Sequence, residues 1–476
     1  MTAATNPAPP ARPTGARLRL RRLDLVSAAT DPATAAERDV LFRRGAVPDP
    51  AVRERARAVL AEVRRDGAAA VRSNNEQFGG GRSDGRLVLE PAELAAARDA
   101  LAPDVRRALD QAIDHVRRFA ATQVPASTRT EIVPGVEIER RWTPLASVGC
   151  YVPGGSAPLP SSLVMTVVPA QVAGVGRIVV ASPAGSDGRE DPLIAGAAGL
   201  LEVDALVVAG GVQAIGALAF GLPESGLGPV DRIVGPGSAW VTAAKLEVAG
   251  EVGIDLPAGP SEGMVLADAS ADPSTVAADL ITQAEHGPDS PALLVTWDPG
   301  FADAVEAAVN RQLVTLPRRA ILERSLAEHG RIVLAPDLDA AIAFVNDYAP
   351  EHLSVEVEDL EPTVARLRNA GSLFVGPWAP ESAGDYATGA NHVLPTGGLA
   401  RSSGALAVEN YGKFVQVQRV TRDGLAALRA TIGTLAGAEG LEAHRAAVEI
   451  RFGPNSASTR GSTPASTPAR DEEPPA

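Results

Sequence analysis

The sequence predicts an α/β fold with two parallel β-sheets whose strands alternate with helices. Short apolar runs rich in β-branched residues recur from about residue 145 onward, and stretches with helical periodicity separate them. Continuous apolar runs of this kind are typical of parallel strands that are buried on both faces. The stretch LPAGPSEG (256–263), dense in Pro and Gly, divides the runs into two groups, which indicates two sheets. The strands are expected at 177–182, 205–210, 232–235, 264–269, 292–297, 331–335 and 372–376.

The segment before these strands is predicted to be helical. Residues 50–122 alternate apolar and charged positions at helical spacing, as in AVRERARAVLAEVRRDG. His115 lies on one of these helices and is expected to be a surface or packing residue. Near the other end, AEGLEAHRAAVEIR (438–451) shows the same amphipathic spacing. Both termini are rich in Pro, Ser, Thr and Ala and have little to bury, so we expect them to be disordered.

We therefore expect two Rossmann-like parallel-sheet domains, a helical N-terminal arm and a small C-terminal helical domain. The first α/β domain is predicted to be discontinuous, with the second inserted into it. The expected boundaries are 1–16 and 454–476 for the tails, 17–48 for the arm, 49–145 plus 262–400 for the first α/β domain, 146–261 for the second, and 401–453 for the C-terminal domain.

The composition favours a small-molecule ligand over nucleic acid. The chain of 476 residues carries 58 acidic and 44 basic residues, a formal charge of -14, and only 4% aromatic residues. Phosphate backbones are bound by clustered Lys and Arg, and unpaired bases stack on aromatic rings, so neither mode is favoured. The single cysteine, Cys150, excludes an intrachain disulfide and fits a reducing compartment, which predicts a cytoplasmic protein.

Two stretches resemble targeting or membrane segments, but another interpretation suits each better. Residues 1–23 contain five arginines and no acid, like a transit peptide, yet they have four prolines and no serine, which indicates a flexible arm. The apolar run ALVVAGGVQAIGALAFGL (205–222) is just long enough for a membrane span. Its Gly210–Gly211 break and polar Gln213 instead predict a buried strand, a turn and a helix.

A helix ending in QAEHG supplies the first candidate metal ligands. Asp272 and Pro273 predict its start, and Gly287–Pro288 predicts its end. Gln283 and His286 are three positions apart and share a face, whereas Glu285 points away. Two ligands do not make a zinc site, so the spacing alone favours a structural role over metal binding.

Further pairs of an acid and a histidine occur in the second half of the chain. Glu351 and His352 are adjacent in YAPEHLS, and such neighbours suit proton transfer because burial tunes their pKa values. The Gly-broken stretch 378–398 is predicted to be a loop that carries Asp385 and His392, and the amphipathic C-terminal stretch carries Glu439 and His444. These segments are as consistent with one shared site as with scattered surface histidines.

The signals for a nucleotide are weaker. No G-x-G-x-x-G motif follows a predicted strand, so the usual dinucleotide fingerprint is absent from the sequence. Three Gly-bearing turns, GCYVPGG (149–155), VVAGGVQAIG (207–216) and VGPGSAWV (234–241), would let a ligand approach the backbone. Each alone is more typical of an ordinary tight turn.

Six long motifs together resemble the histidinol dehydrogenase family, in the family's order and approximate spacing. They are GCYVPGGSAPLPSSLVM, VDRIVGPGSAWVTAAK, IDLPAGPSE, QAEHGPDS, DYAPEHL and GDYATGANHVLPTGG. The resemblance runs from about Leu18 to Phe452. Several long motifs in register are more specific than any single spacing, and they favour the metal interpretation of the QAEHG helix.

The resemblance implies a zinc- and NAD-dependent homodimer, with one zinc per active site, that oxidises L-histidinol to L-histidine in two steps through the aldehyde and completes histidine biosynthesis. It implies a C-terminal domain that dimerises and a first α/β domain that carries the catalytic site. It implies His352 as the general base and Glu351 as the residue that activates water. The implied zinc ligands are Gln283, His286, Asp385 and His444, the last reaching the site of the other subunit.

The resemblance also implies the contacts of the two substrates. The histidinol contacts would be Ser261, Gln283, His286, His352, Asp385, His392, Glu439 and His444, and Glu439 would pair with the ammonium group. The NAD contacts would be Tyr151, Gln213 and Ser238. The family usually has Asn where this chain has Ser238, and the stretch 400–414 also departs from the family, which has an aromatic residue near Ser402.

Three other functions stay open on the sequence. A zinc- and NAD-dependent dehydrogenase could act on another polar alcohol, such as a sulfonated propanediol, although Glu439 and His392 suit histidinol better than an anionic substrate. A zinc hydrolase would use metal-bound water and would not need the Gly-bearing turns. A catalytically silent binding protein is the least favoured, because the full set of implied site residues is present.

Overall fold

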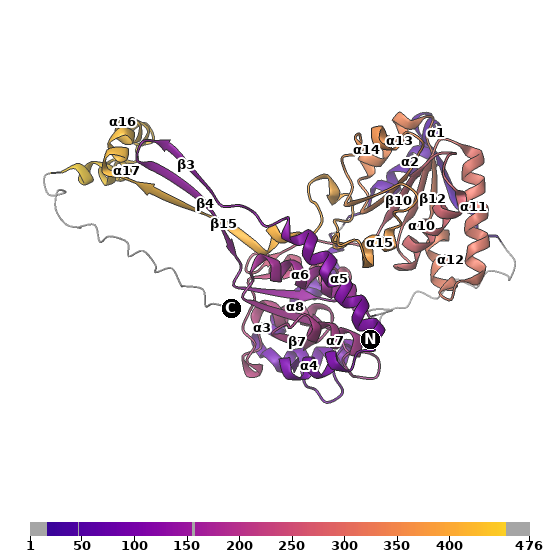
Figure 1. The fold of residues 1–476 in the computed structure, drawn as a ribbon, viewed down its shortest axis with the longest axis horizontal. Coiled ribbons are helices and arrows are strands. Elements are labelled where there is room, and N and C mark those ends of the chain that lie inside the picture. Colours follow the sequence, from indigo (N-terminus) through magenta and orange to yellow (C-terminus); the bar gives the residue numbers. More distant parts are fainter. Residues whose placement is uncertain (1–16, 46, 155–157, 454–476) are drawn as a thin grey trace, which may run out of the picture. The chain divides into compact units, whose positions relative to one another are not determined.

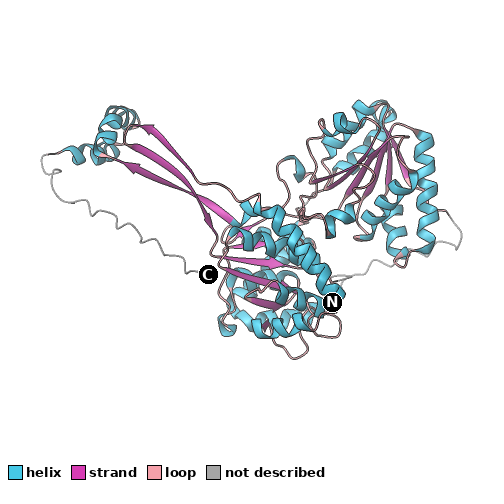
Figure 2. Ribbon diagram, in the orientation of Figure 1, coloured by secondary structure: helices cyan, strands magenta, loops and turns pink. Residues whose placement is uncertain are grey.

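The computed structural model describes residues 17–45, 47–154 and 158–453. The predicted tails, 1–16 and 454–476, lie outside these ranges. The chain divides into two compact units. The main unit holds the described residues up to Pro125 together with Pro144–Lys413, and the small unit holds Ala126–Thr143 together with the described residues from Phe414 onward. The described residues form two six-stranded sheets and one three-stranded sheet (Figure 2), which confirms the predicted α/β class.

The first sheet of the main unit is parallel throughout and runs in the order β1-β12-β11-β10-β13-β14. Its central strands are apolar and buried on both faces, as expected for a sheet covered on both sides by helices. The strands are β1 (Arg21–Asp24), β10 (Gly263–Ala267), β11 (Ala292–Thr296), β12 (Arg331–Leu334), β13 (His352–Glu356) and β14 (Ser372–Val375).

Helices cover both faces of the first sheet (Figure 1). One face packs against α10 (Pro273–Glu285), α11 (Pro299–Gln312) and α12 (Arg319–Glu328). The other packs against α13 (Leu338–Tyr348), α14 (Leu360–Val364) and the helical N-terminal arm, which forms α1 (Leu25–Thr30) and α2 (Pro32–Phe42). The N-terminal arm therefore contributes an edge strand, β1, to the first sheet and covers one face of that sheet with α1 and α2.

The second sheet runs in the order β2-β7-β6-β5-β8-β9 and is parallel except for the edge strand β2. Its strands are β2 (Val88–Leu89), β5 (Ser147–Tyr151), β6 (Arg177–Ser182), β7 (Ala205–Val208), β8 (Arg232–Val234) and β9 (Gly253–Ile254). One face packs against α3 (Pro50–Phe78), α8 (Gly211–Phe220) and α9 (Ala239–Val248). The other packs against α4 (Pro91–Asp99), α5 (Pro103–Ala121), α6 (Pro160–Ala173) and α7 (Pro192–Leu200).

The run 205–222 forms β7, a turn and α8. The predicted buried strand, turn and helix are therefore confirmed. Its turn contains Gly211 with a φ of 59°, a conformation that glycine adopts readily. Among the described residues, no helix has the length and hydrophobicity needed to span a membrane.

Within the main unit, the helices of residues 50–121 pack on the second sheet, although they come from the segment expected to share a domain with residues 262–400. Strand β2 pairs with β7, and α3, α4 and α5 pack on the helices of the second sheet. Small residues permit this close packing: a Cβ added at Gly199 of α7 would lie 1.9 Å from the carbonyl oxygen of Leu94 in α4. Amphipathic spacing shows that a helix buries one face, but it does not reveal which sheet receives that face.

The small unit combines a three-stranded sheet with two helices. The strands β3 (Thr128–Val133), β4 (Val136–Pro144) and β15 (Gly412–Val420) lie in the order β15-β4-β3. The helices are α16 (Arg422–Ala438) and α17 (Glu442–Glu449), as expected for a helical C-terminal segment. The structure adds the hairpin of β3 and β4, which comes from a distant part of the chain. The helices bury little: α16 buries only Gly424 and Ala436, and none of the described residues of α17 is buried.

Candidate active site

The end of α10 carries two of the predicted metal ligands. The Asp272 side chain caps the start of the helix by accepting from the Ser274 N–H, and His286 is the residue that ends it. Gln283, one turn earlier, is 2% exposed. Its Nε2 lies 3.4 Å from Ser261 Oγ, but its Oε1 accepts no hydrogen bond from any described residue. A buried carboxamide oxygen without a partner is costly, which marks this atom as available to a ligand.

A second helix, α15 (Glu381–Tyr386), brings two carboxylates to His286. The Nε2 atom of His286 lies 2.9 Å from Glu381 Oε1. One ligand atom each from His286, Glu381 and Asp385 all lie within 4.8 Å of one another. The sequence predicts a loop over 378–398, and this prediction is wrong for the first part of the stretch, which forms α15. Glu381 and Asp385 therefore lie one helical turn apart.

Glu381 is the site residue that the sequence interpretation missed. Its side chain is almost fully buried and faces His286 and His352, at 2.9 and 3.9 Å. Burial acts to raise its pKa, but the two histidines outweigh burial and hold the pKa below its usual value. The spacing of Glu381 four positions before Asp385 was a usable signal, since both side chains share a face once the segment is helical.

Glu351 and His352 lie where α13 turns into β13. Ala349 ends α13 in the left-handed conformation, with a φ of 53°, and the chain then enters β13 at His352. Glu351 Oε2 accepts hydrogen bonds from the Ser261 hydroxyl (2.8 Å) and the Glu262 N–H (2.9 Å). His352 Nδ1 lies 3.6 Å from the same oxygen. The catalytic candidates and Ser261 are therefore in direct contact.

The ring of His352 connects this pair to the metal-ligand candidates. It lies nearly parallel to the His286 ring, with centroids 6.0 Å apart and an interplanar angle of 11°. Neither ring nitrogen of His352 makes a hydrogen bond to a described residue. An imidazole that is buried, with both nitrogens uncommitted, is able to accept a proton from a bound molecule.

Burial sets the protonation of two further groups. It raises the pKa of Glu351 to about 7, against the opposing effects of His352 and of the two hydrogen bonds from Ser261 and Glu262. It lowers the pKa of His392 to about 4. His392 Nδ1 lies 3.1 Å from the Asp385 carbonyl oxygen and 3.6 Å from its Oδ1, so this neutral histidine holds the end of α15. Glu351 can thus exchange a proton near neutral pH.

The last two of the residues predicted to contact histidinol or zinc belong to the small unit. Glu439 follows the last residue of α16, and His444 lies in α17, and both side chains are exposed. The main unit brings together Ser261, Gln283, His286, Glu351, His352, Asp385 and His392.

The three residues predicted to contact NAD line one cavity of about 890 Å³. Tyr151 ends β5, Gln213 lies in the first turn of α8 after β7, and Ser238 precedes α9. The cavity thus lies at the carboxyl ends of parallel strands, the usual ligand position in α/β sheets. The Tyr151 hydroxyl accepts from the Gly211 N–H at 3.2 Å, while the Ser238 hydroxyl makes no capping hydrogen bond within the described residues.

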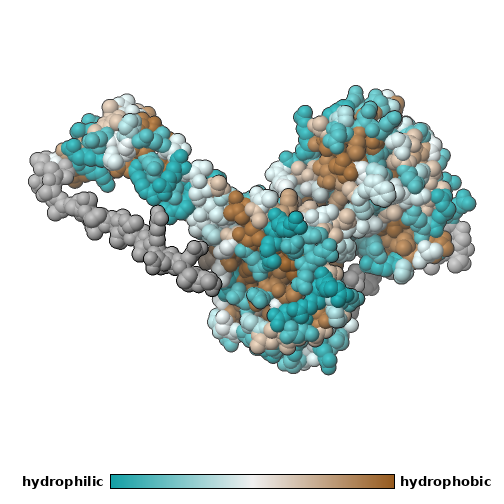
Figure 3. Space-filling model, in the orientation of Figure 1, coloured by the Kyte–Doolittle hydropathy of each residue, from teal (hydrophilic) through white to brown (hydrophobic). Residues whose placement is uncertain are grey.

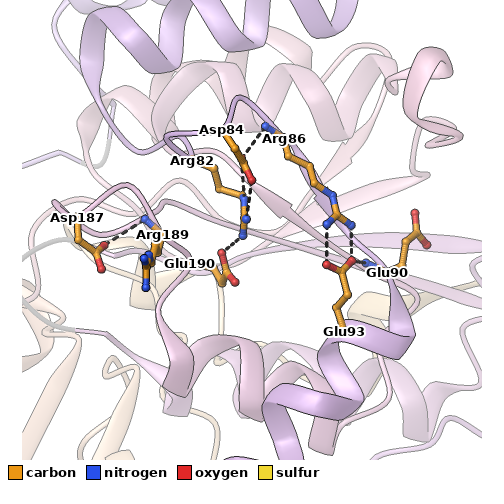
Figure 4. Close-up of polar contacts among 8 residues, drawn as sticks. All are labelled: Arg82, Asp84, Arg86, Glu90, Glu93, Asp187, Arg189 and Glu190. Carbon is orange, nitrogen blue, oxygen red and sulfur yellow. Dashed lines mark hydrogen bonds and ion pairs between the residues drawn. The ribbon is translucent and has the colours of Figure 1, made fainter.

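Ion pairs hold the turns near this cavity. The turn after α3 supplies Gly79 and Gly80 to the lining. Just beyond it, Arg82 forms ion pairs with Asp84 and Glu190 (Figure 4), so the segment after α3 is tied to the segment before α7. In the turn that leads to Ser238, the Gly235 carbonyl oxygen accepts a hydrogen bond from buried Lys245 at 3.0 Å, and Lys245 forms an ion pair with buried Asp255. These pairs fix the loops that a ligand in the cavity would contact.

Comparison with known proteins identifies the family. The family model for histidinol dehydrogenase matches residues 43–452. The histidinol dehydrogenase of Leifsonia xyli subsp. xyli is 48% identical over 397 residues, which cover 83% of this chain and 91% of the relative. That of Nocardia farcinica is 45% identical over 442 residues, covering 92% and 98%. A crystal structure of histidinol dehydrogenase from Elizabethkingia anophelis superposes with a TM-score of 0.83 at 34% identity, covering 92% of this chain and 99% of that one. The chain therefore belongs to the histidinol dehydrogenase family, whose members are oxidoreductases.

Proposed function

We propose that this protein oxidises L-histidinol to L-histidine in two NAD-dependent steps, with L-histidinal as the intermediate and zinc as a cofactor. The observation that carries the proposal is the contact of the buried Glu351–His352 pair with the cluster of His286, Glu381 and Asp385. Two relatives that bear the name histidinol dehydrogenase are 48% and 45% identical to the chain and support the choice of substrate. The single, buried and unpaired Cys150 is in keeping with a cytoplasmic setting.

The donor atoms of the site fit zinc. An imidazole nitrogen, a carboxylate oxygen and a carboxamide oxygen come from His286, Asp385 and Gln283, and the Gln283 oxygen is buried without a partner among the described residues. We infer that zinc is held by these three residues and by His444 of the partner subunit. Bound zinc would supply Lewis acidity that polarises the hydroxyl of histidinol, and it would offer a place for the nitrogen donors of the substrate.

In the first oxidation, His352 would act as the general base. One of its free ring nitrogens accepts the hydroxyl proton of histidinol while a hydride leaves the carbon that bears the hydroxyl for the nicotinamide, which yields the aldehyde, NADH and protonated His352. Glu381, beside His352 and His286, stabilises the imidazolium that forms. Exposed Glu439 would pair with the substrate's ammonium group, and Ser261 and His392 would complete the contacts to histidinol.

In the second oxidation, water must add to the aldehyde before another hydride leaves. Glu351 would accept a proton from that water, and its pKa of about 7 places the change of protonation near physiological pH. The hydrated aldehyde then loses hydride to a second NAD and becomes the carboxylic acid. The hydrogen bonds from Ser261 and Glu262 hold the Glu351 carboxylate in place for both events.

NAD is proposed to occupy the cavity of the second sheet. Tyr151, Gln213 and Ser238 all line it, and its position at the carboxyl ends of β5, β6 and β7 suits a dinucleotide. Gln213 is fixed by a hydrogen bond from its Nε2 to Asn75 Oδ1 at 3.1 Å. Its orientation is therefore set before the cofactor binds, which lowers the cost of binding.

A homodimer would explain the exposed apolar side chains of the small unit. Leu435, Leu441 and Ile450 are 58%, 41% and 76% exposed, and none of the described residues of α17 is buried. On the face drawn in Figure 3, a few hydrophobic residues lie among hydrophilic ones on this unit. A helix of 8 residues is marginal in water unless it packs against another surface. We propose that a second copy of the chain covers this surface and that His444 enters the partner's site.

The proposal is tested by following NADH formation from L-histidinol before chelation, after chelation and after zinc is restored. We expect two molecules of NADH for each histidine formed, loss of turnover on chelation, and recovery with zinc. His286→Ala should lose the zinc, whereas His329→Ala, at the corresponding end of α12, should keep it. A zinc-loaded protein that does not turn over histidinol would refute the proposal. Turnover of a sulfonated propanediol instead would reassign the substrate.

A further inference from the structure

A buried ion pair lies directly behind the catalytic candidates. We propose that Arg44 of the N-terminal arm and Glu262 form a positioning pair that sets the geometry of Glu351 and His352. This inference rests on the proposed function, because it concerns the same two catalytic residues. Neither Arg44 nor Glu262 was among the site residues predicted from the sequence.

The main chain of Glu262 contacts both catalytic residues. Its N–H donates to Glu351 Oε2 at 2.9 Å, and its carbonyl oxygen accepts from the His352 N–H at 3.2 Å. The preceding residue, Ser261, donates its hydroxyl to the same Glu351 oxygen at 2.8 Å. A displacement of the chain at residues 261–262 would therefore move the carboxylate of Glu351 and the backbone of His352 together.

The side chain of Glu262 fixes that short segment. It is 3% exposed, forms an ion pair with Arg44, and accepts a hydrogen bond from the Gly397 N–H at 3.1 Å. Three segments that are far apart in the sequence thus converge on one carboxylate. Burial acts to raise the pKa of Glu262, and the adjacent Arg44 opposes that effect.

Arg44 is itself held in one orientation. Its guanidinium donates to the Tyr348 carbonyl oxygen, and its central carbon lies 3.3 Å from the centroid of the Tyr348 ring. Tyr348 is 1% exposed and ends α13, two residues before the Pro350–Glu351 peptide. A planar guanidinium offers several donors in fixed directions, so Arg44 connects the residues before Glu351 to the residues that contact it.

A buried ion pair is a poor device for stability alone. Removing two charges from water costs about as much as their attraction returns, and apolar replacements of similar volume are often neutral or stabilising. Because Glu262 contacts both catalytic residues, we infer that the ion pair instead fixes the positions of Glu351 and His352. Catalysis is sensitive to such geometry, since a misplacement of about 1 Å can lower a rate roughly 100-fold.

The purely structural alternative is that the pair only attaches the arm to the first sheet. The chain offers a matched control for this alternative in Arg38, on α2. Arg38 also stacks on an aromatic ring, at 4.7 Å from the Phe42 centroid, and pairs with an acid, Asp347, at 3.6 Å. The Arg38 pair is exposed and does not contact Glu262, Glu351 or His352 within the described residues. Arg38→Met therefore removes an attachment of the arm without disturbing the catalytic pair.

The test compares Arg44→Met, Arg44→Lys and Arg38→Met as zinc-loaded dimers, with rates normalised to bound zinc. We expect Arg44→Met to lower kcat for both oxidation steps roughly 10- to 100-fold, while KM for histidinol and for NAD changes less than about threefold. Arg44→Lys should recover part of kcat, and Arg38→Met should match the wild type. A wild-type kcat in Arg44→Met would overturn the proposal.

Because Arg44→Met leaves a buried carboxylate without its partner, the double variant Arg44→Met/Glu262→Met separates stability from positioning. We expect the double variant to regain thermal stability while kcat stays low. If the double variant regained both thermal stability and kcat, the pair of Arg44 and Glu262 would have only a structural role. Amide hydrogen exchange gives a readout that does not depend on turnover: exchange at Glu262 and His352 should accelerate in Arg44→Met but not in Arg38→Met. If the wild type does not oxidise histidinol, the proposed function fails, and unchanged exchange would separately reject the positioning pair.

Discussion

Replacing Glu351 by Gln isolates the second oxidation step. The carboxamide of Gln has nearly the shape of the carboxylate, and its oxygen can still accept from the Ser261 hydroxyl and the Glu262 N–H, now at 2.8 and 2.9 Å. The variant should therefore fold normally but lack a group that takes a proton from water. We expect the aldehyde-to-acid step to fall by a factor of roughly 100 to 10,000, the usual contribution of a general base. The alcohol-to-aldehyde step should fall much less.

The same substitution should alter stability in a direction set by the pKa. Burial raises the pKa of Glu351 from 4.5 to about 7, so the folded protein holds a proton that the unfolded chain has lost between these values. Folding is therefore increasingly penalised as the pH rises from 4.5 to 7. Gln carries no such penalty. Above neutral pH, Glu351→Gln should be more stable than the wild type by on the order of 3 kcal/mol, at 1.36 kcal/mol per pKa unit.

The assay follows NADH separately from histidinol and from histidinal, and urea denaturation is measured at pH values on both sides of neutral. The matched control is Glu356→Gln, because Glu356 is also buried on β13 but bonds to Thr275 rather than to the catalytic pair. We expect the control to retain both steps, and the wild-type aldehyde step to rise with pH through about 7. Equal loss of both steps in Glu351→Gln would refute the assigned role.

Three further outcomes are expected. Ser238→Asn should lower KM for NAD up to about tenfold, because the longer side chain reaches farther into the cavity; a higher KM in steady-state kinetics would contradict this contact. Lys245→Met should lower the free energy of unfolding by about 3–5 kcal/mol, since it leaves Asp255 buried without its partner; a urea curve like that of the wild type would be inconsistent with it. Ile450→Asp should convert the dimer to monomers and abolish turnover, as seen by light scattering and NADH formation; an active monomer would exclude a shared site.

The sequence predicted the α/β class because strands buried on both faces leave a local pattern. The runs that became β10, β11 and β12 could each be recognised from a few consecutive residues. The helices of residues 50–122 were also recognisable from their spacing. The sheet on which they pack was not, because the apolar face of a helix does not specify the surface that it contacts. Contacts between distant segments, such as α3 with α8, arise only when the whole chain is folded.

The residues of the candidate site also fall into those that a local pattern predicts and those that only the folded chain brings together. Gln283 and His286 share a face by their spacing alone, and their relation to Asp385 followed from the family motifs. The sequence does not predict Glu381, because the glycine in the stretch around it favours a loop, and only the observed helix α15 aligns Glu381 with Asp385. The pair of Arg44 and Glu262 had no local signal at all, because the two residues come from separate regions of the chain.

The pairing of β1 with β12 has a consequence for synthesis of the protein. Residues Arg21–Asp24 are synthesised before their partners, Arg331–Leu334, which follow several hundred positions later in the chain. Until then β1 is an unpaired strand whose backbone could join the wrong partner. Its composition limits that risk, since Arg21 and Arg22 are charged and exposed in the final fold and only Leu23 is buried. By charge and position, these arginines are suited to be gatekeeper residues, which keep the strand from pairing wrongly before its neighbour in the sheet, β12, has been synthesised.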